Sequence, residues 1–213
     1  MSNLSKLYDA ILDGDAKLAA AMANEALAEQ RPPMEVINQY MVPAMDEVGR
    51  RFDCEEYFVP ELLLSARAMK AALGPLRPLL AASGVQPVGR IVIGTVKGDL
   101  HDIGKNLVAA LLEGGGFDVI DLGADVPAKK FVEAVQTSGA GIVALSALLT
   151  VTMPSMKNTI EAFSLAGIRD NVRVIVGGAP VTQQFADQIG ADGYGENATA
   201  AVALARRLVQ QPA

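Results

Sequence analysis

The sequence has little of several residue types that would indicate particular functions: one cysteine, one histidine, no tryptophan, and only four tyrosines and six phenylalanines. The single cysteine, Cys54, excludes an internal disulfide framework, and we interpret it as a bystander at the end of a helical stretch. Few aromatic rings are available to stack on bases, no long basic run occurs, and the formal net charge is -6. We therefore expect no nucleic-acid partner.

Long apolar runs are absent as well. No stretch approaches the roughly 18 apolar residues that a membrane span requires, and residues 1–6 lack the charged and apolar regions of a secretory signal. We expect a cytoplasmic protein with no membrane partner. Hydrophobic residues make up 51% and charged residues 20% of the 213 residues, which indicates a globular chain long enough for one large or two small domains.

The first part of the chain, residues 1–82, has a helical pattern throughout. Residues 13–15 interrupt the first apolar stripe and cap a second helix expected over 16–29, Pro32-Pro33 begins a third helix, and Pro60 begins a fourth. Four helices with short connections predict a four-helix bundle. The methionines interpreted as residues of its core are Met34, Met41, Met45 and Met69.

Residues 83–89 contain glycine and proline, and we predict a domain linker there. Beyond it, over 90–213, strand and helix patterns alternate. This alternation predicts a five-stranded parallel sheet with helices on both faces, the flavodoxin-like (Rossmann-type) α/β arrangement. The expected strands lie near 90–95, 118–121, 142–145, 173–176 and 192–194. The expected helices lie near 103–113, 127–138, 155–166, 182–189 and 198–209.

The only histidine, His101, lies in the loop 96–105, between the first predicted strand and the following helix. This loop is expected at the carboxyl edge of the sheet, where open α/β folds bind ligands. Without further context, such a histidine is more often a solvated or structural residue than a metal ligand. A ligating imidazole commonly donates its other N–H to a carboxylate, and Asp99 could accept it. One histidine cannot hold bare zinc or copper, so further ligands would have to come with a cofactor.

The same loop has some features of a phosphate-binding loop. However, five residues instead of four separate Gly98 from Gly104, and Asn106 follows Lys105 where that motif requires serine or threonine. Two aspartates within the loop would also repel a phosphate. Nucleotide binding by this loop is therefore not expected.

The segment Asp99-Leu100-His101-Asp102-Ile103-Gly104 resembles the Asp-x-His-x-x-Gly motif of cobalamin-binding domains. The resemblance implies that the corrin ring supplies four nitrogen ligands to cobalt. It also implies that His101 is the metal ligand that replaces the cofactor's own lower base (base-off/His-on), while the detached nucleotide tail enters the sheet domain. The cofactor-binding residues implied in this loop are Gly98, Asp99, Leu100, His101, Asp102, Ile103 and Gly104.

Other loops at the same edge exclude two further functions of this fold. A receiver domain would end its third strand with a phosphorylatable aspartate, where this chain has Ser146. A flavodoxin would have a Ser/Thr-rich phosphate loop after its first strand, whereas residues 96–102 contain no serine or threonine. Residues 146–153 are instead similar to the second cobalamin-binding motif, in which small and hydroxyl side chains line the channel for the nucleotide tail. The cofactor contacts implied here are Ser146, Leu148, Thr150, Thr152, Gly177, Gly178 and Ala198.

These loop residues also have simpler interpretations. Serine and threonine after a strand are commonly turn formers or helix caps, and paired glycines commonly make a tight turn. Thr152 occupies the place of a serine that, in methionine synthase, contacts the aspartate of a histidine–aspartate relay. Because threonine keeps the hydroxyl, the resemblance implies a relay of Thr152, Asp99 and His101.

Residues 49–52, 57–61 and 65–69 resemble the helical cap that precedes the cobalamin domain in methionine synthase and in corrinoid methyl-carrier proteins. In that family an aromatic residue lies over the upper corrin face and shields cobalt from water. Phe58 matches this residue by position. The alternative is that Phe58 fills the core of the bundle.

The resemblance implies a free-standing corrinoid protein that is not catalytic alone. It would shuttle a methyl group between a substrate-specific methyltransferase and a second methyltransferase that acts on an acceptor such as tetrahydrofolate or a thiol, and a reductive activase is a further candidate partner. The alternative function is corrinoid storage or delivery. A cobalamin-dependent sensor is less favoured, because it would need a DNA-binding segment and the acidic N-terminal part offers none.

Overall fold

The computed structural model describes residues 4–82 and 87–210, and the chain divides into two compact units. One unit comprises residues 1–87 with 110–116, and the other comprises residues 88–109 with 117–213. The predicted linker, 83–89, falls mainly on residues 83–86, which lie outside the described residues.

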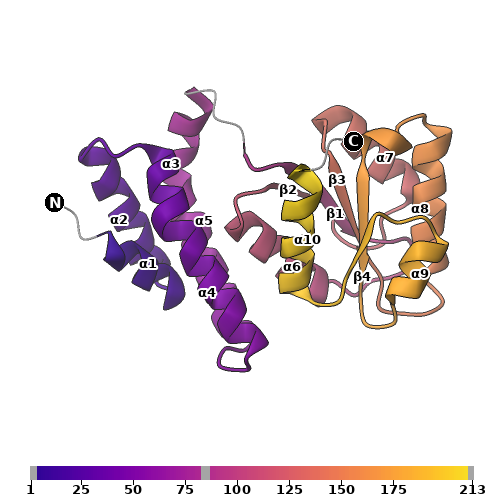
Figure 1. Cartoon of the computed structure of the whole chain (residues 1–213), viewed down its shortest axis with the longest axis horizontal. Coiled ribbons are helices and arrows are strands. Elements are labelled where there is room, and N and C mark those ends of the chain that lie inside the picture. The colour runs from indigo at the N-terminus through magenta and orange to yellow at the C-terminus, as the bar shows by residue number, and fades with distance from the viewer. Residues whose placement is uncertain (1–3, 83–86, 211–213) are drawn as a thin grey trace. The chain divides into compact units, whose positions relative to one another are not determined.

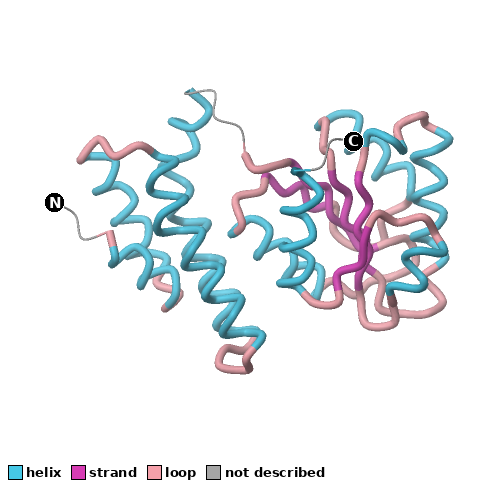
Figure 2. The backbone as a smooth tube through the Cα atoms, viewed as in Figure 1, coloured by secondary structure: helices cyan, strands magenta, loops and turns pink. Residues whose placement is uncertain are grey.

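The first unit is helical, as predicted (Figures 1 and 2). Asp15 caps its second helix, since its side chain accepts a hydrogen bond of 2.9 Å from the N–H of Leu18. Of the four methionines predicted for the core, Met41, Met45 and Met69 are buried and Met34 is partly exposed. The helices of this unit are α1 (Ser5–Leu12), α2 (Ala16–Ala28), α3 (Pro33–Val36), the π-helical turn η1 (Ile37–Met41), α4 (Val42–Asp53) and α5 (Val59–Ala82).

The second unit contains a five-stranded parallel sheet in the order β2-β1-β3-β4-β5, which confirms the predicted fold class. The strands are β1 (Arg90–Thr95), β2 (Asp118–Asp121), β3 (Ile142–Ser146), β4 (Arg173–Gly177) and β5 (Gly193–Gly195). The connecting segments contain α6 (Ile103–Gly114), α7 (Ala128–Ser138), α8 (Pro154–Leu165), the 3-10 turn η2 (Arg169–Asn171), α9 (Gln183–Gln188) and α10 (Ala198–Gln210). The last part of α6, from residue 110, belongs to the first unit.

Helices cover both faces of this sheet: α6 and α10 lie on one face, and α7, α8 and α9 lie on the other (Figure 1). The central strands β1, β3 and β4 are largely apolar and buried, as expected for strands that are covered on both faces. On the side of α7, α8 and α9, the buried core includes Val92, Phe131, Val143, Met156, Phe163 and Val174. Among the described residues, no helix is both long and apolar enough to cross a membrane.

The chain order places a topological switch between β1 and β3. After β1 the chain moves to β2 on one side, and it then returns to β3 on the other side of β1. The loops that follow β1 and β3 therefore meet at the carboxyl edge of the sheet, where open α/β folds form their ligand crevice. The first of these loops contains His101.

Candidate functional site

The histidine loop, residues 96–102, begins where β1 ends and is held in a defined shape. The hydroxyl of Thr95 donates to the carbonyl oxygen of His101 at 2.9 Å, which ties the loop back to the end of the strand. Gly98 has a φ of +89°, a left-handed conformation that glycine adopts without steric cost. The side chain of His101 is 50% exposed. The loop thus presents its imidazole to solvent.

A fully buried carboxylate, Asp99, orients this imidazole. Oδ1 of Asp99 lies 2.8 Å from Nδ1 of His101 and also accepts the backbone N–H of His101 at 3.0 Å. An ionised carboxylate can only accept hydrogen bonds, so the proton of this pair resides on Nδ1 of His101. In the neutral form of the imidazole, this tautomer leaves the lone pair on Nε2.

The loop after β3 satisfies the other oxygen of Asp99. Oδ2 of Asp99 accepts the N–H of Leu148 at 2.8 Å, the N–H of Leu149 at 3.3 Å and the hydroxyl of Thr152 at 2.7 Å. Burial by itself would raise the pKa of Asp99, but the hydrogen bonds from Leu148, Thr152 and His101 outweigh burial and lower this pKa well below its usual range. The structure therefore links Thr152, Asp99 and His101 in one chain of contacts.

Several apolar side chains are exposed to solvent, both close to His101 in the sequence and in the loop after β3. Leu100 is 76% exposed and Ile103 is 75% exposed, and Val151 in the loop after β3 is 81% exposed. Leu148 and Leu149 are also exposed. Exposing so much apolar surface at one edge is unfavourable unless a ligand or partner covers it. Leu100, Ile103 and Leu148 were predicted as contacts, whereas Leu149 and Val151 were not.

Gly177 and Gly178, at the end of β4, allow three loops to approach closely. A Cβ on Gly178 would lie 1.9 Å from the carbonyl oxygen of Ala147, and the φ of Gly178 is +127°. A Cβ on Gly177 would lie 3.0 Å from the carbonyl oxygen of Gly195. The glycines are therefore required by backbone contacts at this edge, in addition to any contact with a ligand.

The remaining predicted site residues occupy the same edge of the sheet in different settings. Ser146 is the last residue of β3 and is half-buried, Thr150 is exposed in the following loop, and Ala198 is buried at the start of α10. Asp102 and Gly104 flank the first residue of α6, and the carbonyl oxygen of Asp102 accepts the N–H of Asn106 at 2.8 Å.

Phe58 lies in the helical unit, next to the first residue of α5, and its backbone N–H donates to Oε2 of Glu61 at 3.0 Å. Its side chain is 64% exposed. The alternative that Phe58 fills the core of the bundle is therefore wrong. A large aromatic ring on the surface is available to cover a ligand or a partner.

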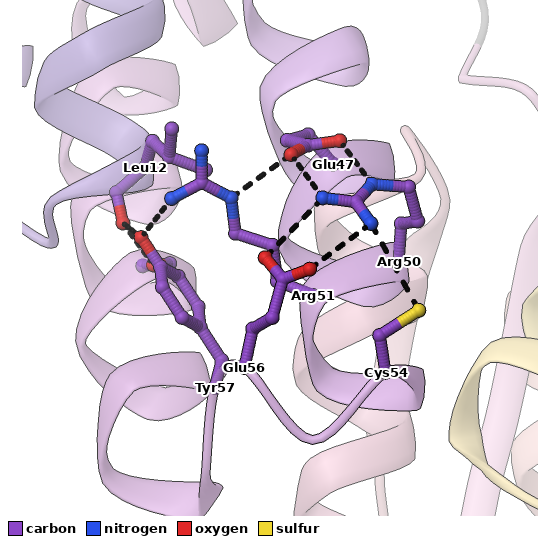
Figure 3. Close-up of polar contacts among 8 residues, drawn as sticks. Leu12, Glu47, Arg50, Arg51, Cys54, Glu56 and Tyr57 are labelled. Atoms are coloured by element: carbon purple, nitrogen blue, oxygen red, sulfur yellow. Dashed lines mark hydrogen bonds and ion pairs between the residues drawn. The ribbon is translucent and has the colours of Figure 1, made fainter.

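A polar network holds the turn that precedes α5 (Figure 3). Arg51 donates to the hydroxyl oxygen of Tyr57 at 3.0 Å and to Glu47 at 2.9 Å, and the Tyr57 hydroxyl donates to the carbonyl oxygen of Leu12 at 3.3 Å. Glu47 also accepts Nε of Arg50 at 2.8 Å. The hydrogen bonds from Arg50 and then Arg51 lower the pKa of Glu47 to about 2. The network therefore includes a carboxylate that stays ionised.

Sequence reasoning missed two acidic residues near the histidine loop. Asp125, after β2, contacts the loop directly. Asp121, the last residue of β2, pairs with the buried ammonium group of Lys105. A signal for both was present, because Asp121 ends the strand next to β1 and Asp125 follows it, so both lie at the same edge of the sheet.

Comparisons with known proteins show which families this chain is similar to. Two family models, each described as a B12 binding domain, match residues 89–203 and residues 4–77. The trimethylamine corrinoid protein 1 of Methanosarcina acetivorans is 45% identical over 208 residues, which cover 97% of this chain and 96% of that protein. The dimethylamine corrinoid protein of Methanosarcina barkeri is 43% identical and covers 97% of each chain.

Two solved structures are similar as well. A cobalamin-binding protein from Desulfitobacterium hafniense DCB-2 matches with a TM-score of 0.79 and 34% identity, covering 98% of this chain and 99% of that one. A chain of the methanol:cobalamin methyltransferase complex MtaBC from Methanosarcina barkeri matches with a TM-score of 0.87 and 31% identity, covering 98% of this chain and 80% of that one.

Proposed function

The chain belongs to the B12-binding family of corrinoid proteins of methyltransferase systems. We propose that it carries a methyl group on a bound corrinoid, and that Nε2 of His101 ligates the cobalt of this corrinoid. The cofactor of this family is a corrinoid, which contains cobalt. When bound, the corrinoid supplies a cobalt centre that accepts and donates a methyl group. The base-off/His-on mode of binding is part of the proposal.

The observation that carries the proposal is the pairing of His101 with Asp99. Nδ1 of His101 lies 2.8 Å from a fully buried carboxylate, so the second ring nitrogen is the one left for a metal. Metal-ligating histidines are commonly oriented by a carboxylate in this manner, which fixes the tautomer and raises the basicity of the ligating nitrogen. The exposed apolar side chains of Leu100, Ile103 and Leu148 suit contact with the apolar parts of a corrin ring.

Thr152 and Asp99 have supporting roles in this proposal. Asp99 holds the proton on Nδ1 of His101, and Thr152 holds Asp99 through a hydrogen bond of 2.7 Å. The relay would keep the imidazole in one orientation and stabilise the proton on Nδ1. Gly98, Asp102 and Gly104 shape the loop around it.

We assign residues at and just after the ends of β3 and β4, together with Ala198 at the start of α10, to the nucleotide tail. Ser146 and Thr150 offer hydroxyl groups, and Gly177, Gly178 and Ala198 offer small side chains where bulky ones would fill a channel. A buried base needs both space and hydrogen-bond partners for its polar atoms.

The partners in this proposal are two methyltransferases. A substrate-specific methyltransferase would deliver the methyl group, and a second one would pass it to an acceptor such as tetrahydrofolate or a thiol. A reductive activase would restore the cofactor after oxidation. The names of the relatives, which include corrinoid proteins for trimethylamine and dimethylamine and a methyltransferase complex, support this assignment. We also place the protein in the cytoplasm, with no catalytic residue of its own.

The exposed ring of Phe58 completes the proposal. We assign it to cover the upper corrin face and shield the methyl group from water, with residues 83–89 as the linker between a cap of residues 1–82 and a cobalamin domain of residues 90–213. Shielding implies that the cap moves away when a methyltransferase acts.

The test is reconstitution with hydroxocobalamin, using the full chain and the His101→Ala variant. The wild type should bind cobalamin in the base-off form, and the cob(II)alamin state should show an electron paramagnetic resonance spectrum split by one nitrogen nucleus. Labelling the imidazole of His101 with ¹⁵N should change that splitting. The His101→Ala variant should lack the splitting from a histidine nitrogen. A wild-type protein that stays colourless, or that keeps the base-on form, would contradict the proposal.

A further inference from the structure

The loop between β2 and α7 contacts the histidine loop through the side chain of Asp125 and through a backbone bridge between Val126 and Val96. Asp125 has a φ of +55°, in the left-handed region that aspartate and asparagine adopt more readily than other non-glycine residues. Its side chain is 39% exposed, so it is neither a core residue nor a freely solvated one. Its conformation directs the carboxylate at the neighbouring loop.

Asp125 contacts three consecutive residues of the histidine loop. Oδ1 of Asp125 accepts the backbone N–H of Gly98 at 2.8 Å, and Oδ2 accepts Nζ of Lys97 at 2.9 Å. Its own N–H donates to the carbonyl oxygen of Asp99 at 2.9 Å. The contacts to Gly98 and Lys97 lower the pKa of Asp125, so the carboxylate stays ionised. Every polar group of Asp125 that faces the loop is thus engaged with it.

We propose that Asp125 is a positioning residue for His101: it holds the histidine loop in the one conformation that lets Asp99 orient the imidazole. The structural part of this inference stands on the contacts above. Its consequence for cobalt ligation rests on the proposed function.

The positions of the contacts explain why Asp125 matters. Asp99 is held from two sides, because the loop after β3 binds its carboxylate and Asp125 binds its carbonyl oxygen. The residue before Asp99 is Gly98, and glycine can adopt many more backbone conformations than any other residue type. Asp125 fixes the N–H of Gly98 and so restricts the most adaptable residue of the loop. Without that bond, Asp99 would keep its partners after β3 while His101 would sample other orientations.

Two substitutions distinguish the effect of the Asp125 side chain from the effect of its backbone conformation. Asparagine and glycine both tolerate a φ of +55°, but Asp125→Asn keeps an oxygen for the N–H of Gly98, whereas Asp125→Gly removes it. Lys97→Met removes only the exposed ion pair. Asp118→Ala is the matched control, because Asp118 pairs with Arg90 at 2.7 Å at the other end of β2.

The first measurement is amide hydrogen exchange of the full chain without cofactor. In Asp125→Gly, the amides of Gly98 and His101 should exchange about tenfold faster than in the wild type. Asp125→Asn and Lys97→Met should stay within about threefold of the wild type, and Asp118→Ala should leave these amides unchanged. Equal exchange at Gly98 and His101 in Asp125→Gly and the wild type would overturn the proposal.

The second measurement is the nitrogen splitting of the cob(II)alamin spectrum. Asp125→Gly should lower the fraction of protein that shows the splitting, and Asp125→Asn should restore it, whereas a residue that only stabilises the fold would leave this fraction unchanged. An undiminished fraction in Asp125→Gly would overturn the proposed effect on His101. If the wild type itself showed no splitting, the proposed function would fail, while the exchange of Gly98 and His101 would still decide the role of Asp125.

Discussion

The hydroxyl of Thr152 donates to Oδ2 of Asp99 at 2.7 Å, across 53 positions of the sequence. This bond joins the loop after β3 to the loop after β1, at the point where the strand order of the sheet reverses. Both side chains are buried. A donor of this kind contributes more than a surface hydrogen bond, because water cannot replace it when it is lost.

We therefore expect Thr152→Val, which keeps the shape of the side chain and removes the hydroxyl, to destabilise the fold by about 1–3 kcal/mol. Thr152→Ser keeps the donor and should lose about 1 kcal/mol or less. Urea unfolding of the cofactor-free chain measures both. Equal stability of Thr152→Val and the wild type would show that the Leu148 and Leu149 amides suffice to satisfy Asp99.

A second prediction concerns Gly178. Any side chain there would have to displace the backbone of Ala147, since a Cβ would lie 1.9 Å from its carbonyl oxygen. Gly178→Ala should destabilise the chain by about 3 kcal/mol or more, or prevent its folding. The control is Gly139→Ala, because Gly139 also has a positive φ, +68°, but a Cβ there meets nothing within 4 Å. The control should cost about 1–2 kcal/mol, which unfolding curves of both variants can test.

A third prediction concerns pH. The hydrogen bonds from Arg50 and Arg51 lower the pKa of Glu47 from 4.5 to about 2 in the folded chain. Because the folded-state pKa lies below the unfolded one, Glu47 stabilises the fold above about pH 4.5, and this contribution is lost as the pH falls toward 2. The melting temperature of Glu47→Gln should therefore be lower than that of the wild type at pH 7. The two should converge near pH 2, and a difference that is constant with pH would contradict the assignment.

Much of the architecture was predictable because its signals are local. Apolar runs bounded by glycine and proline marked the five strands, and the observed bounds of β1 and β2 are the expected ones, 90–95 and 118–121. The importance of His101 also followed from sequence, because the residues around it form a contiguous motif. Local patterns carry such information without any knowledge of the fold.

Other features depend on distant contacts and could not be read locally. The role of Asp125 depends on a backbone φ of +55° and on a partner 27 positions away. The exposure of Phe58 depends on how the turn before α5 is held, which spacing alone does not determine. Lys105 illustrates the same limit, because a charged residue in a helix is usually solvated, yet its side chain here is 1% exposed.

A final prediction concerns the pair of Lys105 and Asp121. Removing one partner should destabilise the fold more than removing the other. The ammonium group of Lys105 is buried and contacts Asp121 and Oδ1 of Asn106, whereas the side chain of Asp121 is 39% exposed. Removing Asp121 leaves a buried charge without its counter-charge, but removing Lys105 leaves a carboxylate that water can solvate. Asp121→Ala should therefore destabilise the fold by about 2–4 kcal/mol, and Lys105→Met by about 1 kcal/mol or less.

The double variant Lys105→Met/Asp121→Ala sharpens this comparison. It should recover most of the stability lost in Asp121→Ala alone, because the unpaired buried ammonium is no longer present. Glu133→Ala is the surface control, since Glu133 pairs with Lys129 where both side chains are exposed, and it should change stability by about 0.5 kcal/mol or less. Denaturant unfolding of the four variants measures these differences. Equal losses in Asp121→Ala and Lys105→Met would mean that the ammonium of Lys105 finds other partners when Asp121 is removed.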